Sequence, residues 1–286
     1  MESSRLPVRS PAPRLVFLFA TLSLTCAATG LLCAAIMSDH WEELYWDKEA
    51  LKRSNISPMW YLDGKVGHLE AGSRRDSPLI NDRHKAIASP DKSKTRNSFL
   101  VPMHGGIWTM CASLTDEEIK LLAQVGFPQE RCINYLSPDE AHEGMRAAWQ
   151  NRMQNLSISC SLVCLIILGS AVIVGLFGLC RHQISAVLVT GVMYLLAAVF
   201  ALFTLTIIQC KRSQERASSH TLPEGGPEDG VFGSPVERSA LKCRRFVASW
   251  SMDLGWAGVT LSALASVAWI LLSKIMRFSP ISAMIA

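Results

Sequence analysis

Four long apolar runs constrain this 286-residue chain more than any other feature. The runs 15–37, 158–179, 184–209 and 255–272 contain no Asp, Glu, Lys or Arg. Each run can cross roughly 30 Å of hydrocarbon at about 1.5 Å per helical residue. Because a bilayer offers no water to backbone polar groups, these runs must form helices. The sequence therefore predicts an all-α membrane protein with a bundle of four transmembrane helices.

The four spans leave five further segments: two tails, two large loops and one tight turn. We place the spans at residues 15–37, 156–180, 184–209 and 253–274. The tails are 1–14 and 275–286, the large loops are 38–155 and 210–252, and residues 181–183 form a tight turn. The first run resembles a signal peptide, but it is longer than the roughly 7 to 15 apolar residues of a cleaved signal. We therefore expect it to be retained as a span.

The cysteine positions favour one membrane orientation. Basic residues flank the spans on both sides, so charge alone does not decide it. Cys111 and Cys132 share the first loop, and Cys210 and Cys243 bracket the second. Paired cysteines suit disulfides in an oxidising compartment, which would place both loops outside the cytosol and both termini within it. The alternative for Cys210 and Cys243 is a pair of juxtamembrane thiols on the cytosolic side.

Two positions are candidates for covalent modification. The triplet Asn55-Ile56-Ser57 in the first loop fits an N-glycosylation acceptor, although Pro58 disfavours its use. Cys180 lies beside Arg181 at the end of the second span and is a better candidate for palmitoylation than Cys210 or Cys243.

The composition and the periodicity of the first loop change along its length. Residues 55–97 are polar and show no sustained period, which predicts a flexible insertion. Short strands are expected at 99–101 and 106–110. The segment Thr115-Asp116-Glu117-Glu118 is a capping box that predicts an amphipathic helix after it. A second capping box at 137–140 and the composition of 141–154 predict a helix that leads into the second span.

Several of these residues together resemble a known signature. Ser38-Asp39-His40-Trp41 follows the first span, and Gly106-Ile107-Trp108-Thr109-Met110-Cys111 and then Cys132 come later in the loop. This pattern resembles the Gly-Leu-Trp and two-cysteine signature of the claudin superfamily, which includes peripheral myelin proteins and calcium-channel gamma subunits. Ser249-Trp250-Ser251 is similar to a pattern that many members carry before the last span.

The resemblance implies a fold and a set of structural residues. In that superfamily a small extracellular antiparallel β-sheet, formed mainly by the first loop, caps a four-helix bundle. Carried over to this chain, the structural motif residues are Trp41, Gly106, Trp108 and Trp250. The resemblance also implies a disulfide between Cys111 and Cys132.

Departures from the superfamily pattern determine which function we expect. Both loops are long, and the terminal residues 282–286 lack the motif that scaffold-binding claudins present to PDZ domains. We therefore expect a regulatory or auxiliary subunit of a channel, a receptor or the calcium-entry machinery. The alternative is a cell-cell adhesion or barrier protein of the junction type. The expected partners are membrane lipid and another membrane protein, with a homo-oligomer as a further option, in the plasma membrane or else the endoplasmic reticulum.

Other functional classes find no support in the residues. The net charge is only +4, and no basic block alternates with aromatic residues, so no nucleic-acid partner is expected. The group Asp39, His40, Glu42 and Glu43 fits a solvated membrane edge better than a metal site. No phosphate loop or nucleophile elbow is present, and we predict no catalysis and no cofactor.

Overall fold

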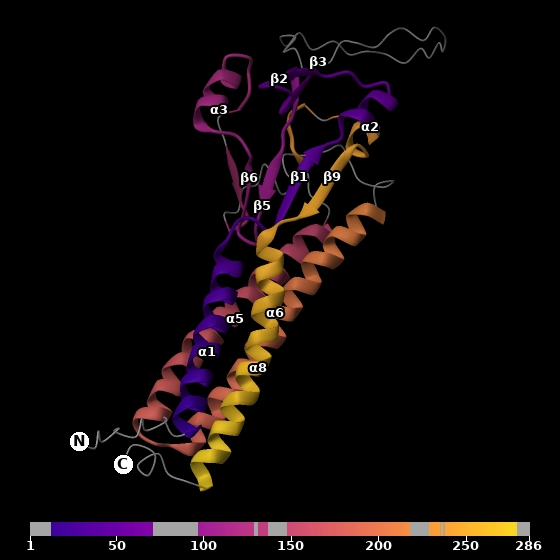
Figure 1. Cartoon of the computed structure of the whole chain (residues 1–286). Coiled ribbons are helices and arrows are strands. Elements are labelled where there is room, and N and C mark those ends of the chain that lie inside the picture. The colour runs from indigo at the N-terminus through magenta and orange to yellow at the C-terminus, as the bar shows by residue number, and fades with distance from the viewer. Residues whose placement is uncertain are drawn as a thin grey trace, which may run out of the picture. The chain divides into compact units, whose positions relative to one another are not determined.

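The computed structural model describes residues 13–70, 97–128, 131–136, 148–217, 229–234, 236 and 238–278 (Figure 1). In chain order the elements are α1 (Pro13–Met37), β1 (Glu42–Trp46), α2 (Lys48–Arg53), β2 (Met59–Tyr61), β3 (Val66–Glu70), β4 (Asn97–Leu100), β5 (Met103–Gly105), β6 (Thr109–Ala112), α3 (Asp116–Ala123), β7 (Cys132–Asn134), α5 (Ala148–Cys180), α6 (Ile184–Ala217), β8 (Val231–Gly233), α7 (Arg238–Leu241), β9 (Arg244–Ala248) and α8 (Trp250–Phe278).

The chain forms two compact units. The membrane unit comprises residues 1–38, 152–210 and 250–286, and the loop unit comprises 39–151 and 211–249. Four helices are long and apolar enough to cross a membrane, at Leu15–Met37, Trp149–Cys180, Ile184–Ser213 and Trp250–Phe278. The chain is therefore an integral membrane protein by the length and composition of its helices, as the apolar runs predict.

Small residues allow the helices of the membrane unit to approach closely. Helices α1 and α8 lie side by side (Figure 1). At Gly258 of α8, an added Cβ would lie 2.7 Å from Cδ2 of Leu32 in α1, so only glycine fits there. Ser251 also donates a 2.8 Å hydrogen bond to Ser38. Because lipid is as apolar as the helix surface, such close packing and interhelical hydrogen bonds are what holds a bundle together in a membrane.

The loop unit contains two antiparallel sheets where the sequence predicts one. Their strand orders are β7-β6-β5-β1-β9 and β2-β3-β4-β8. The second loop supplies β8 and β9, one edge strand to each sheet, so neither sheet belongs to the first loop alone. β9 pairs with all five residues of β1, from Glu42 opposite Ala248 to Trp46 opposite Arg244. The fold is therefore mainly helical but not all-α.

The predicted flexible insertion is partly ordered. Residues 59–61 and 66–70 form the β2–β3 hairpin, whose turn uses positive φ at Leu62, Asp63 and Gly64. The hairpin is held by fully buried Val66 and by the pairing of β3 with β4, so a non-local contact overrides the polar local sequence. Residues 71–96 of the insertion lie outside the described residues, as do the second capping box and residues 141–147.

The core of the loop unit draws on both loops. Phe127 contacts Phe99 and Phe232 at ring-centroid distances of 5.4 and 5.2 Å, and these rings come from three different segments. Helix α3 begins with the predicted capping box, in which Thr115 and Glu118 each accept a hydrogen bond from the other's backbone N–H. Aromatic packing and a satisfied helix start thus fix the interior and one flank of this unit.

One of the two predicted disulfides is present. Cys111 of β6 is bonded to Cys132 of β7, across two directly paired positions. Cys210 and Cys243 are free thiols in this structure, but they belong to different units, so the second disulfide stays a prediction. Cys243 is buried in the loop-unit core, where its thiol donates to the Ser239 carbonyl at 3.5 Å, whereas Cys210 is exposed.

Replacing both Cys111 and Cys132 with Ser should destabilise the loop unit. The bond closes a loop with a sequence separation of 21, for which unfolded-state entropy predicts a loss of about 2 to 4 kcal/mol. Thermal unfolding of the purified full chain in detergent measures the effect. The matched control is Cys210→Ser, which removes an exposed free thiol and should leave the melting temperature unchanged. A wild-type melting temperature in the double variant would contradict a stabilising disulfide.

Replacing His68 with Phe should stabilise the loop unit. His68 is 4% exposed, lies 4.8 Å from the Phe99 ring, and neither of its ring nitrogens has a hydrogen-bond partner among the described residues. An apolar ring removes this desolvation cost, which is about 1 to 3 kcal/mol, at the expense of some added volume. We expect a higher melting temperature for His68→Phe and a lower one for His104→Phe, because His104 does have a partner. A decrease in both would argue against an unsatisfied imidazole.

Candidate functional site

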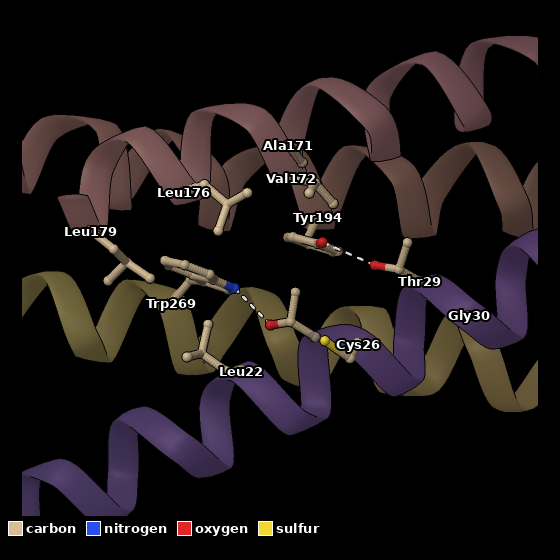
Figure 2. A pocket seen from close by; sticks show the side chains of 12 residues that line it. Leu22, Cys26, Thr29, Gly30, Ala171, Val172, Leu176, Leu179, Tyr194 and Trp269 are labelled. Carbon is tan, nitrogen blue, oxygen red and sulfur yellow. Dashed lines mark hydrogen bonds between the residues drawn. The ribbon is translucent and has the colours of Figure 1, made fainter. Parts of the chain in front are cut away.

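A cavity of about 290 Å³ lies within the membrane unit. Helices α1 and α5 supply most of its walls, while Tyr194 of α6 and Trp269 of α8 extend into it (Figure 2). Its lining is mostly apolar and includes Leu22, Leu176 and Leu179. Concave apolar sites with a few polar groups are the usual form of small-molecule sites, so this cavity is the candidate functional site.

Glycine positions explain why the hollow opens between α1 and α5. Gly178 brings α5 against Ala186 of α6, and Gly191 brings α6 against Ile270 of α8, with an added Cβ at 3.0 Å from a neighbouring side-chain carbon in both cases. Gly258 brings α8 against α1 in the same way. Gly30 of α1 instead has nothing within 4 Å of an added Cβ, and it lines the cavity.

One polar pair in the cavity wall is internally satisfied. Trp269 Nε1 donates a 2.9 Å hydrogen bond to the Thr25 hydroxyl. That hydroxyl donates in turn to the Thr21 carbonyl one helical turn earlier, at 2.6 Å. The indole and the threonine hydroxyl therefore fix the Trp269 ring against α1, and neither has a donor left for another molecule.

A second polar pair retains an unused donor. Tyr194 is fully buried, and its hydroxyl lies 3.0 Å from that of Thr29, with the two side chains pointing toward one another (Figure 2). Each hydroxyl carries one hydrogen, and a single hydrogen bond uses only one of the two. Among the described residues no acceptor is in position for the second hydrogen. The pair therefore offers one O–H donor inside an apolar cavity.

A second group of polar residues lies in the loop unit. The His40 and His104 rings stack at a centroid distance of 4.7 Å. Asp39 lies 2.6 Å from His40 Nδ1 and 3.6 Å from His104 Nε2, and His104 Nδ1 lies 3.0 Å from the Ser113 hydroxyl. Burial lowers the pKa of His104, an effect that the nearby Asp39 carboxylate opposes. The sequence placed Asp39 and His40 together but gave no signal for His104.

This group does not fit a metal site well. Asp39, His104 and Cys111 bring their ligand atoms within 4.8 Å of one another. However, Cys111 is bonded to Cys132, so it offers no thiolate. Asp39 and His104 then supply two ligands, fewer than the three protein ligands that even an open zinc site uses. The third nearby residue, His40, has its Nδ1 atom 2.6 Å from Asp39, and its ligand atoms do not belong to this group.

The predicted structural motif residues take distinct positions. Trp41 is 2% exposed and is held by backbone hydrogen bonds to Gly105 and from Ser249. Gly106 and Trp108 lie in the turn between β5 and β6, where Gly106 N–H donates to the Thr109 carbonyl at 2.8 Å. Trp250 is the first residue of α8 and is half exposed. Trp41 therefore bonds to residues that adjoin β5 and β9, Gly106 and Trp108 form the β5–β6 turn, and Trp250 begins a helix.

The candidate modification sites are both accessible. Asn55 is exposed after α2, with φ of 59°. Cys180 is an exposed free thiol at the last residue of α5. Glycosylation and palmitoylation at these positions stay predictions.

Two comparisons with known proteins found no relative of this chain. The chain matches no family model, and a search of curated proteins found no match.

The cavity residues are functional candidates that the sequence reasoning missed. Thr21, Thr25 and Thr29 recur every fourth residue in the first span and so share one helix face. This hydroxyl stripe was the available signal. Tyr194 and Trp269 carried no local signal, because only the packing of α6 and α8 brings them to α1.

Acidification should destabilise the loop unit through His104. Its pKa is lowered by folding, so the unfolded chain binds the proton more readily. The associated stability is present above about pH 6.5 and is lost as the pH falls through the folded value. We expect a decrease in melting temperature between pH 7.5 and 5.5 that is smaller in His104→Gln, whereas the control His182→Gln keeps the wild-type dependence. Equal slopes in all three proteins would contradict this role.

Proposed function

We propose that this chain is a non-catalytic auxiliary subunit of a larger membrane complex, such as a channel or receptor, with its loop unit outside the cytosol. The resemblance of Trp41, the Gly106 to Trp108 turn and the Cys111–Cys132 pair to the claudin superfamily supports the proposal. That superfamily includes channel-associated gamma subunits. The plasma membrane is the proposed location.

The composition of the spans supports a regulatory role over a conducting one. The four apolar runs contain no Asp, Glu, Lys or Arg. Ion and proton pathways in membranes are ordinarily lined by ionisable side chains or by exposed backbone carbonyls. In this chain the cavity between α1 and α5 is instead lined by apolar side chains and hydroxyls. The interaction with a partner is therefore the function that the chemistry favours.

The outer face of β1 and β9 is the observation that carries the proposal. Glu43 pairs with Val247 and Tyr45 pairs with Arg245, and all four residues are exposed. Tyr45 and Val247 are 48% and 46% exposed, respectively. Tyr and Arg are the residue types that dominate binding energy at protein interfaces. We call these four residues the β1–β9 face.

Disrupting the β1–β9 face should release the partner. We expect that tagged wild-type chain purified in a mild detergent carries a second membrane protein in fixed stoichiometry. The double variant Tyr45→Ala, Val247→Lys should retain less than about a tenth of it, since interface anchors contribute 2 kcal/mol or more. The control Leu121→Lys changes an exposed apolar residue on α3 of the same unit and should retain all of it.

Two outcomes of this experiment would contradict the proposal. Recovery of copies of this chain alone, with loss on the same double variant, would favour the adhesion or homo-oligomer reading. Recovery of no stoichiometric partner would contradict both readings. Location is tested by surface biotinylation, because Lys52 and Lys65 are exposed in the loop unit and react on intact cells only if that unit is outside.

A further inference from the structure

The size of the cavity between α1 and α5 limits what can occupy it. The cavity holds about 290 Å³, a volume that can be compared with those of cavities in other proteins. A dry cavity of about 150 Å³ in another protein accommodates benzene, so by proportion this one holds about twelve non-hydrogen atoms.

The depth of the cavity indicates where its occupant comes from. Tyr194 lies about 15 Å along α6 from Ile184, near the middle of a hydrocarbon layer about 30 Å thick. On the outer surface of the membrane unit the cavity is flanked by exposed residues of α1 and α5, namely Cys26, Gly30, Val172 and Leu176. A molecule that reaches this opening has to be dissolved in the bilayer.

The polar chemistry of the cavity defines the ligand further. Thr25 and Trp269 satisfy each other, whereas the Thr29–Tyr194 pair has one hydroxyl hydrogen without an acceptor among the described residues. In hydrocarbon no water replaces the missing acceptor. An occupant that carries one oxygen at this depth would complete the pair, and a pure hydrocarbon would not.

We propose that the cavity is a binding site for a small lipophilic molecule that carries a single acceptor oxygen, as a hydroxyl or a carbonyl. The oxygen accepts the hydrogen bond from the Thr29–Tyr194 pair. The apolar body packs against Leu22, Leu176, Leu179 and the Trp269 ring. All residues that line this site belong to the membrane unit, so its test does not use the β1–β9 face.

Photolabelling of the purified full chain tests the site. The probe is azioctanol, a medium-chain alcohol that carries a diazirine, and the labelled residues are mapped by mass spectrometry. We expect labels within residues 22–30 of α1 and 171–179 of α5. Octanol should compete with them about tenfold more effectively than octane at equal membrane concentration, as one added hydrogen bond predicts. Equal competition by the two would overturn the role of the oxygen.

Three variants separate binding from folding. Gly30→Leu fills the cavity and should abolish the label, whereas Gly169→Leu, at an exposed glycine of α5 that also has open space around it, should not change it. The double variant Thr29→Val, Tyr194→Phe keeps the cavity and removes both hydroxyls, so it should remove the preference for octanol over octane. A label that persists in Gly30→Leu would overturn the site. If Gly30→Leu does not fold, an unchanged preference in the double variant would overturn the proposal by itself.

The source of the occupant is tested by comparing detergent with lipid nanodiscs. Labelling that is competed by octanol in both media supports a site for an oxygen-bearing small molecule. Labelling in detergent that disappears in nanodiscs of saturated phosphatidylcholine would show that lipid tails fill the cavity, and would overturn the proposal.

Discussion

The structure depends on the pairing of the segments that adjoin the first and last spans. Helix α1 ends at Met37 and β1 begins at Glu42, while β9 ends at Ala248 and α8 begins at Trp250. These segments pair in both units: α1 packs against α8 in the membrane unit, and β1 pairs with β9 in the loop unit. Packing one pair shortens the effective loop that closes the other, so each lowers the entropy cost of its neighbour. These two pairings thus join the first span and the strand after it to the last span and the strand before it.

Several basic residues of the second loop form charge pairs within the loop unit. Arg212 is paired with Glu42 and lies 3.9 Å from the Phe246 ring. Arg244 is paired with Asp229, and Arg245 lies 3.8 Å from Asp47. These basic residues of the second loop therefore serve the internal structure of the loop unit. Orientation rules count positive charges near spans without regard to such pairs, so these pairs leave the membrane orientation a prediction.

Local sequence patterns were sufficient to predict an element where a single segment forms it without contacts to distant residues. The four spans follow from charge-free runs, and α3 follows from Thr115 and Glu118. The three-residue strands β2 and β8 were missed because they are too short to show a period and are held by strands distant in the chain. Cysteine counting paired Cys111 with Cys132 correctly. It gave no indication that the Cys243 thiol is buried, because only the folded loop unit creates the core around it.

The membrane cavity could not be predicted from the sequence, because residues that are distant in the chain line it. Its volume has an energetic consequence. In a water-soluble core an empty volume of 290 Å³ would cost about 7 kcal/mol at roughly 24 cal/mol per Å³. Between α1 and α5 the hollow opens on the outer surface of the membrane unit, so a molecule dissolved in the bilayer can fill it and offset most of this cost. We therefore expect the cavity to be occupied. The residues that line it then determine which kind of molecule binds. The unused hydroxyl hydrogen of the Thr29–Tyr194 pair is the one feature of the wall that distinguishes an oxygen-bearing molecule from a hydrocarbon tail.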